Sequence, residues 1–454
     1  MAEVQTITKT SEANPLAQDF SAGSLLRFAL PTICMMVFSG LYTTVDTVFV
    51  SRFVGTDALS SINIVTPVIN VIVGLGTMLT AGGSAIVARK MGDRRNREAR
   101  QDFTLIVFTA GLFGLVIAIV GLLFLEKIIR GLGASDRLLP YAAEYLSVLL
   151  AFSPANMLQV VFASFFVAAG RPGLGMGLGL AAGTVNGVLD FFFMGILGMG
   201  IRGAAIATGL GYTIPALGGM IFFLRNRTGI LRFVRPRLRF RVLGESCVNG
   251  SSEMVSQLSA AVTTFLFNAA MMRRLGEDGV AAITIIIYSQ FLLTTLYIGF
   301  SMGVSPVISY NYGSGNTGGL KRIFRICTGC ITLFSLVIFV LSLCGGPCLA
   351  GFFSAEGTPV YLLARTGFRI VPFGFLLCGL NIFASALFTA LSNGKVSAAI
   401  SFLRTFGFLT IGIVALPLWI GDTGIWLAIP LAEFLTLVFS LFCVRRYRRV
   451  YKYY

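Results

Sequence analysis

Asn186 and Asp190 lie four residues apart in the strongly apolar stretch TVNGVLDFFFMG, which covers residues 184–195. On a helix, this spacing places both side chains on one face. A carboxylate in apolar surroundings is stable only when it is paired with a charge, hydrogen-bonded or neutralised by a proton. The stretch therefore predicts a polar site inside an otherwise apolar element.

Asp46 and Thr208 could complete this site, since each also lies in an apolar run. Carboxylate, amide and hydroxyl oxygens are hard ligands that suit a small cation. The same carboxyl groups could hold a proton, because burial and a like-charged neighbour both favour the protonated form. A hydrogen-bonded network that only fixes helix packing stays open as the alternative.

The composition indicates which elements must position these side chains. Of the 454 residues, 56% are hydrophobic and 12% are charged, whereas soluble domains carry roughly 25% charged residues. Apolar runs of about 18 or more residues recur along the chain, and each can cross a hydrocarbon core of about 30 Å. We therefore predict an all-α, polytopic membrane protein.

The residue types also limit the chemistry. The chain has no histidine, which is the commonest metal ligand and general base. Its eight cysteines are scattered, several of them in apolar segments, so we expect reduced core residues and no zinc or disulfide framework. No nucleophile–base pair or metal-ligand set is visible, which argues against an enzyme and against a cofactor.

Twelve apolar segments are long enough to span a membrane. They cover residues 25–51, 60–88, 102–125, 139–169, 174–196, 203–224, 242–272, 279–309, 323–345, 358–391, 396–420 and 424–444. The first twenty residues are polar, so we expect no signal peptide. With an even number of spans, both termini lie on one side of the membrane.

The basic residues indicate which side this is. They gather after the second and sixth segments and after the last one, in the runs 89–100, 225–241 and 445–452. Cytoplasmic loops retain Lys and Arg, so both termini are predicted to face the cytoplasm at the cell membrane. The net charge of +16 then reflects membrane orientation, and the basic residues contact anionic membrane lipids. No aromatic–basic module accompanies it, which argues against nucleic acid as a partner.

The chain contains an internal repeat. A shift of 221 residues superposes Gly55 on Gly276, Asp57 on Asp278, and Gly82-x-Ser84 on Gly303-x-Ser305. Each half holds six spans, so the two copies have the same orientation and are related by an axis along the membrane normal. Two such pseudo-symmetric six-helix bundles with a cavity between them are typical of transporters.

We expect five parts in this architecture. They are a cytoplasmic N-terminal tail (1–24), a first lobe with six spans (25–224), a cytoplasmic linker (225–241), a second lobe with six spans (242–444) and a basic cytoplasmic tail (445–454).

Depths along the helices support one site in the outer half of the first lobe. At 1.5 Å per residue, Asp46 lies roughly 30 Å from the start of its span and Asp190 about 24 Å from the start of its own. Thr208 lies about 8 Å from the outer end of the sixth span. The repeat aligns Asp46 and Asp190 with Phe267 and Ile411, so only one lobe carries the acidic pair. A dedicated ion site can differ between the lobes in this way.

A ridge of small residues runs beside Asn186 and Asp190. Glycine recurs every fourth residue at Gly175, Gly179, Gly183 and Gly187. Such a ridge allows a neighbouring helix to approach closely.

Other polar residues are candidates to line the cavity between the lobes. Glu253 and Gln257, with Thr264 and Asn268, form a stripe on the seventh span that should face protein or water. Glu253 and Arg404 lie at similar depths and could pair, as a structural ion pair or as a second functional site. The proposed cavity lining comprises Asn63, Thr66, Asn70, Glu253, Gln257 and Arg404.

Several segments resemble the multidrug and toxic compound extrusion (MATE) family. They are PTICMMVFSGLYTTVD (31–46), VGTDAL (54–59), GLG (74–76), GGSA (82–85) and MGD (91–93). The Asn186-x-x-x-Asp190 pair and GAAIAT (203–208) resemble its DinF-like branch. The resemblance covers roughly residues 20–448.

This resemblance implies twelve helices in two lobes around a V-shaped cleft, and export of cationic, amphipathic drugs in exchange for inward H⁺ or Na⁺. It also implies a cation site, with H⁺ or Na⁺ held by Asp46, Asn186, Asp190 and Thr208 together with the Ala204 carbonyl. NorM-like members use acidic residues of the second lobe, where only Glu253 lies in comparable territory here, at a spacing that does not match.

We therefore predict a secondary active multidrug antiporter that works by alternating access. We expect a monomer with drugs or toxins as substrates and no cofactor beyond the coupling ion. One alternative is an exporter of a lipid-linked saccharide, which twelve spans and few buried basic residues disfavour. A passive channel or membrane sensor is another, and a channel would move substrate without an opposing ion gradient.

Overall fold

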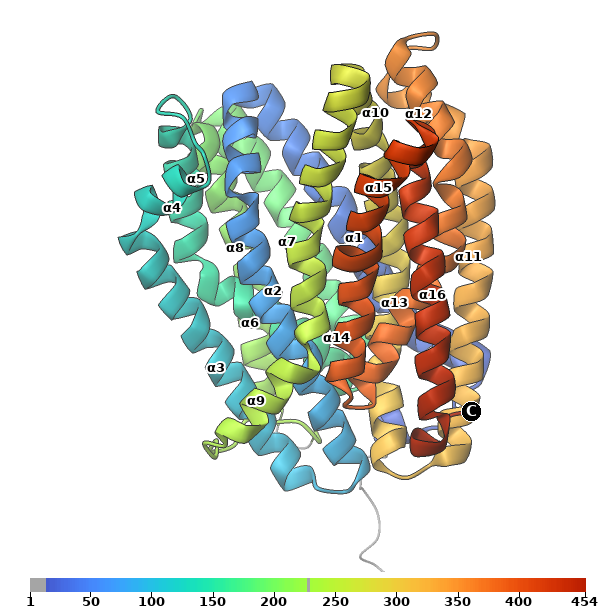
Figure 1. Cartoon of the computed structure of the whole chain (residues 1–454). Coiled ribbons are helices and arrows are strands. Elements are labelled where there is room, and N and C mark those ends of the chain that lie inside the picture. Colours follow the sequence, from blue (N-terminus) through green and yellow to red (C-terminus); the bar gives the residue numbers. More distant parts are fainter. Residues whose placement is uncertain (1–13, 227–228) are drawn as a thin grey trace, which may run out of the picture.

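The computed structural model describes residues 14–226 and 229–454, and within these ranges every regular element is a helix (Figure 1). After the short η1 (Pro15–Ala17), the first half contains α1 (Ala22–Phe53), α2 (Thr56–Gly92), α3 (Asn96–Leu123), α4 (Leu125–Gly131), α5 (Leu139–Ala151), α6 (Ser153–Ala168), α7 (Pro172–Asp190), η2 (Phe191–Ile196) and α8 (Gly200–Arg225). The second half contains α9 (Phe240–Asn249), α10 (Ser251–Gly313), α11 (Thr317–Phe353), α12 (Pro359–Ile370), α13 (Pro372–Ala390), α14 (Gly394–Phe402), η3 (Leu403–Leu409), α15 (Thr410–Ile420) and α16 (Thr423–Tyr451).

The described residues contain the twelve predicted spans. Ten helices are long and apolar enough to cross a membrane, and α5 with α6, bent by 54°, makes an eleventh. The long α10 breaks at Gly276, where φ is 66° and ψ is −155°, so its two arms are separate spans. Gly276 repeats Gly55, which precedes α2 with φ 110°. Glycine adopts such positive φ values without steric cost, which explains its use at both corners.

Both lobes carry a π-helical segment at a charged residue within the membrane-spanning part. In the first lobe, η2 begins directly after Asp190. In the second lobe, η3 contains Arg404. π-Helical turns are rare, and they occur frequently at functional sites.

The lobes lie side by side, the first half mostly blue to green and the second half yellow to red in Figure 1. They meet closely at the basic end, which we define as the end where α2, α10 and α16 finish. A Cβ atom on Gly92 would lie 2.1 Å from the Tyr310 carbonyl oxygen, and one on Gly313 would lie 2.0 Å from the Arg89 carbonyl oxygen. Since these pairs exchange under the 221-residue shift, the two glycines form a symmetric crossing of α2 and α10.

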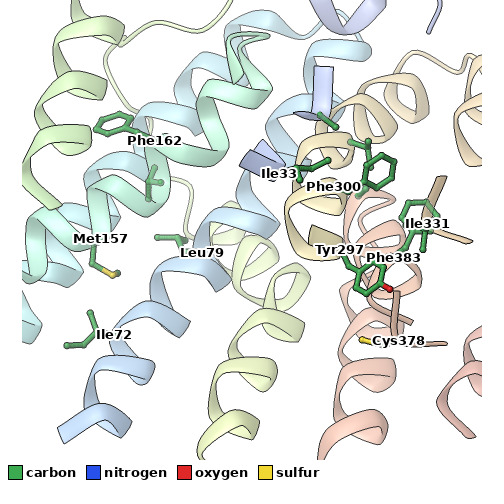
Figure 2. Packing of buried hydrophobic residues seen from close by; sticks show 14 of the residues in the cluster. Ile33, Ile72, Leu79, Met157, Phe162, Tyr297, Phe300, Ile331, Cys378 and Phe383 are labelled. Carbon is green, nitrogen blue, oxygen red and sulfur yellow. The ribbon is translucent and has the colours of Figure 1, made fainter. Parts of the chain in front are cut away.

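Two spans pack against the opposite lobe at this end. Gly299 of α10 lies against α1, where an added Cβ would be 2.8 Å from the Ile33 Cα. Figure 2 shows Ile33 beside Phe300, next to the second-lobe core around Tyr297, Cys378 and Phe383. In the same way, Gly250 lies against α2, with an added Cβ 1.9 Å from the Met78 carbonyl oxygen. The first part of α1 therefore packs on the second lobe, and the start of α10 packs on the first lobe.

Candidate cation site in the first lobe

Asp46 and Asp190 come together from α1 and from the end of α7. Their carboxyl groups lie near enough to interact with one another. Asp190 has 0% of its surface exposed. Both Asp190 oxygens and Asp46 Oδ1 are buried, and no donor among the described residues hydrogen-bonds to them. Two buried carboxylates in this arrangement need a positive charge, which a proton or a small cation can supply.

Asn186 and Thr208 lie beside the two acids. Asn186, 4% exposed, is one turn before Asp190, and its Nδ2 donates a long hydrogen bond of 3.5 Å to Thr208 Oγ1 on α8. Gly211 permits this contact between helices, since a Cβ there would lie 3.3 Å from the Asn186 Cβ. Ala204 is buried one turn before Thr208, and the role of its carbonyl stays a prediction.

The glycine ridge on α7 lets α1 approach closely, but only along the central part of the ridge. An added Cβ would lie 3.0 Å from Met35 Cγ at Gly179, and 3.1 Å from Tyr42 Cδ1 at Gly183. At Gly187 the same atom would meet nothing within 4 Å. Two of the four glycines therefore provide the close approach to α1.

Three tyrosines that the sequence interpretation missed lie in the neighbourhood of the acidic pair. Tyr42, Tyr145 and Tyr212 all lie within range of electrostatic interaction with Asp46. The i,i+4 spacing of Tyr42 from Asp46, and of Tyr212 from Thr208, could have revealed two of them. Tyr145 has no such local signal, because the fold alone brings α5 to the site. The phenol groups add polar atoms to the neighbourhood of the two acids.

The second lobe has a different buried charge pair. Arg404 donates hydrogen bonds to Glu433 Oε1 from Nε at 2.8 Å and from Nη2 at 2.7 Å. Asn381 Nδ2 donates to Glu433 Oε2 at 2.7 Å. The expected pairing of Arg404 with Glu253 is therefore wrong. Glu433 lies in the apolar run of the last span and was not predicted as a partner. Its side chain points toward Arg404.

The other cavity candidates lie on two helices that face each other. Gln257 of α10 packs against Gly74 of α2, where an added Cβ would be 3.3 Å from the Gln257 Cβ. Asn70 is one turn before Gly74 and half-buried, as is Glu253 one turn before Gln257. Asn63 is exposed, and the Thr66 hydroxyl donates to the Ile62 carbonyl at 2.8 Å. Arg404 is 21% exposed and bound to Glu433, which removes it from the set of free cavity groups.

The described residues contain no group of three or more His, Cys, Asp or Glu side chains that could hold a metal ion. The site of Asp46 and Asp190 has only two acids, which suits a monovalent ion. All eight cysteines are free thiols, including Cys327 and Cys330, whose Cys-x-x-Cys spacing lies within α11.

Comparison with known proteins identifies the family of the chain. A family model described as MatE matches residues 31–192 and 254–414, once in each half. The chain belongs to the MatE family. Its first matched segment contains Asp46, Asn186 and Asp190 and ends before Thr208. Membership of the MatE family makes the chain a membrane transporter rather than an enzyme.

Individual MatE relatives match over nearly the whole chain. The multidrug export protein MepA of Staphylococcus saprophyticus is 23% identical over 412 residues, which cover 90% of each chain. A crystal structure of MATE in complex with MaL6 has a TM-score of 0.92 at 22% identity, covering 98% of this chain and 99% of that one. An outward-facing multidrug resistance MATE transporter has a TM-score of 0.90 at 23% identity, over 98% and 99%. These likenesses establish the MatE fold.

Proposed function

We propose that the protein is a secondary active multidrug antiporter of the cell membrane. It exports cationic, amphipathic organic compounds in exchange for H⁺ or Na⁺ bound at Asp46 and Asp190. The observation that carries this proposal is the pair of facing carboxyl groups, whose buried oxygens have no protein donor in the described part of the chain. The MatE relatives that are named multidrug export proteins support the substrate class.

The coupling ion acts on helix packing in this mechanism. An ion that neutralises Asp46 and Asp190 removes their mutual repulsion and lets the outer part of α1 pack against α7. Asn186 and Thr208 orient the acids or contribute oxygens to the ion, with the Ala204 carbonyl as a further ligand. Loss of the ion reverses this change, so each ion bound biases the two-state equilibrium of the lobes.

The substrate occupies the region between α2 and the first arm of α10. Asn70, Gln257 and Glu253 provide polar groups there, with Asn63 and Thr66 further along α2. Met254 lies among them, its Sδ 2.7 Å from the Cβ position of Gly74. Methionine fits varied apolar shapes, which suits a site for structurally different compounds. Ion and drug then favour different lobe arrangements, which couples their movements.

The same proposal includes the orientation and the assembly. Both termini, the 225–241 linker and the basic tail face the cytoplasm, because cytoplasmic loops retain basic residues. The transporter works as a monomer, since each ion and drug group named above belongs to one chain.

Replacing Asp190 with Asn tests the proposed function directly. Cells that express Asp190→Asn should lose resistance to ethidium, down to the level of cells without the transporter, because the neutral amide removes the charge that the ion compensates. Asp422→Asn is the matched control, since Asp422 is 53% exposed and pairs with Arg274 away from the site. Full resistance of Asp190→Asn at equal expression would overturn the mechanism.

A further inference from the structure

A second polar site lies at the basic end of the second lobe. A pocket of about 340 Å³ opens there between the beginning of α11 and the end of α16. Its lining consists of Thr317, Lys321, Arg448, Arg449, Lys452 and Tyr454. Four of these six residues are basic and none is acidic.

The segment that follows α16 is held in place and forms one wall of this pocket. Lys452 adopts a left-handed backbone conformation with φ 54°, which turns the chain back toward α11. Tyr453 fixes the turn, because its ring is 0% exposed and its hydroxyl donates to the Val444 carbonyl at 2.9 Å. The ring also packs 5.1 Å from Phe324 of α11. Lys452 and Tyr454 are therefore placed over the start of α11 by a buried anchor.

The corresponding end of the first lobe also carries a cluster of basic residues. There, Glu98 forms ion pairs with Lys90 (3.4 Å), Arg95 (2.7 Å) and Arg239 (3.0 Å). Asp102 forms a further ion pair with Lys90. Three basic groups of the first lobe, Lys90, Arg95 and Arg239, are thus paired with two internal acids.

The second lobe has neither of these acids, and Asn311 and Asn316 stand where the first lobe has Lys90 and Arg95. The 221-residue shift replaces Glu98 by Gly319 and Asp102 by Ile323. The same shift aligns Lys321 with Arg100, whose Nε donates to the Ile230 carbonyl at 2.7 Å in the first lobe. By contrast, none of Lys321, Arg448, Arg449 and Lys452 has an ion-pair partner within residues 14–226 and 229–454. Asp19, the acid beside α11, lies 3.8 Å from Arg322 outside the pocket.

The surroundings of the pocket favour a phosphate group as the missing counter-ion. Thr317 is the first residue of the 37-residue α11, so the partial positive charge of a helix N-terminus adds to that of the basic side chains. The pocket lies where α11 and α16, both membrane-spanning helices, leave the apolar core. Lipid phosphates occupy this level of a bilayer. A carboxylate at Tyr454 would offset only part of the positive charge.

We propose that this pocket binds the phosphate headgroup of an anionic phospholipid, which serves as the counter-ion of its four basic residues. The bound lipid links α11 to α16 and holds the turned-back segment 452–454 in place. The site is separate from the ion site and from the drug region, and it does not depend on the proposed antiport.

Lipid titration of the purified full-length protein, followed by native mass spectrometry, tests this proposal. Phosphatidylglycerol should bind more tightly than phosphatidylcholine. The triple variant Lys321→Gln/Arg448→Gln/Arg449→Gln should weaken phosphatidylglycerol binding by roughly fivefold for each charge removed, the contribution of one basic residue at an anionic membrane surface. The double variant Arg235→Gln/Arg237→Gln, which removes exposed basic residues of the linker, should keep wild-type binding.

Tyr453→Ala distinguishes a specific binding pocket from a general electrostatic attraction of anionic lipid. The variant removes the buried anchor of the pocket wall but keeps every basic side chain. It should weaken phosphatidylglycerol binding at least as much as the loss of one basic residue, roughly fivefold. If Tyr453→Ala does not fold, the triple variant decides alone, since its three residues are exposed. Equal binding of both lipids, or equal losses in the triple variant and the linker control, would overturn the proposal. Displacement by millimolar inorganic phosphate without any lipid preference would also overturn it and assign a free phosphate.

Discussion

At the scale of single residues, the two lobes compensate buried charge in opposite ways. Glu433, 4% exposed, is bound permanently by the Arg404 guanidinium and by Asn381. Asp190, 0% exposed, has no such donor among the described residues and faces Asp46. A fixed cation makes the second-lobe pair a structural element, whereas the acids of the first-lobe pair have no hydrogen-bond donor among the described residues.

Removing one member of the Arg404–Glu433 pair should destabilise the protein strongly. Arg404→Met leaves the Glu433 carboxylate buried without its cation, which costs about 3–5 kcal/mol. The double variant Arg404→Met/Glu433→Leu should recover most of this loss, because it removes both charges. Thermal unfolding of the purified protein in detergent measures the difference. A double variant as unstable as Arg404→Met would show that the pair is not the source of the stability.

Sequence reasoning found the polar residues that carry a spacing signal. Asn186 and Asp190 follow the helical period, and the structure brings them together with Asp46 and Thr208. It chose the wrong partner for Arg404, because pairing across helices depends on how each helix is rotated about its axis. Tyr145 was missed for the same reason, since its interaction with Asp46 depends on how α5 packs in the folded lobe.

At the scale of helices, the crossing of α2 and α10 depends on glycine. Gly92 and Gly313 each face a carbonyl oxygen of the opposite helix, at positions that the internal repeat exchanges. Their lack of a side chain lets the two backbones touch near the pseudo-symmetry axis. This contact holds the basic ends of the lobes together.

A methyl group at this crossing should separate the basic ends. Gly92→Ala places a Cβ 2.1 Å from the Tyr310 carbonyl oxygen, and such overpacking costs the closed arrangement about 1–3 kcal/mol. Spin labels at Asp93 and Ser314, in a background without the native cysteines, should report longer distances. Gly329→Ala is the matched control, because nothing lies within 4 Å of its Cβ position. An unchanged distance distribution in Gly92→Ala would contradict a steric role for this glycine.

Hydropathy predicted the existence of the spans better than their ends. The predicted second span stops at residue 88, whereas α2 continues to Gly92, and the last helix continues to Tyr451 through the basic run. Arginine and lysine are good helix formers, so a helix can extend beyond the apolar segment from which it is predicted. Similarly, the two spans within α10 are separated at Gly276 alone, whereas hydropathy predicted a gap of several residues between them.

At the scale of the whole molecule, α1 connects the two lobes. Near its beginning, Ile33 packs against Gly299 of the second lobe. Near its end, Asp46 faces Asp190 of the first lobe. One helix therefore links the proposed ion site to the contact between the lobes.

Proteoliposomes with one imposed gradient at a time should identify the coupling ion. We expect ethidium transport to follow either ΔpH or ΔNa⁺, and Asp190→Asn to abolish the response to that gradient. The Asp422→Asn control should retain it. Transport that continues at the same rate after both gradients are collapsed would indicate a passive channel and exclude exchange.

The segment that follows α8 bears on how the protein is made. Residues 230–239 are tied to α3 at both ends, through the Ile230 carbonyl and the Arg239–Glu98 ion pair, and Phe233 stacks on Phe103 at 5.2 Å. During synthesis this stretch leaves the ribosome directly after the sixth span. This stretch can thus close the basic end of the first six spans before the seventh exists, so that the nascent second half meets a first half whose end is already packed.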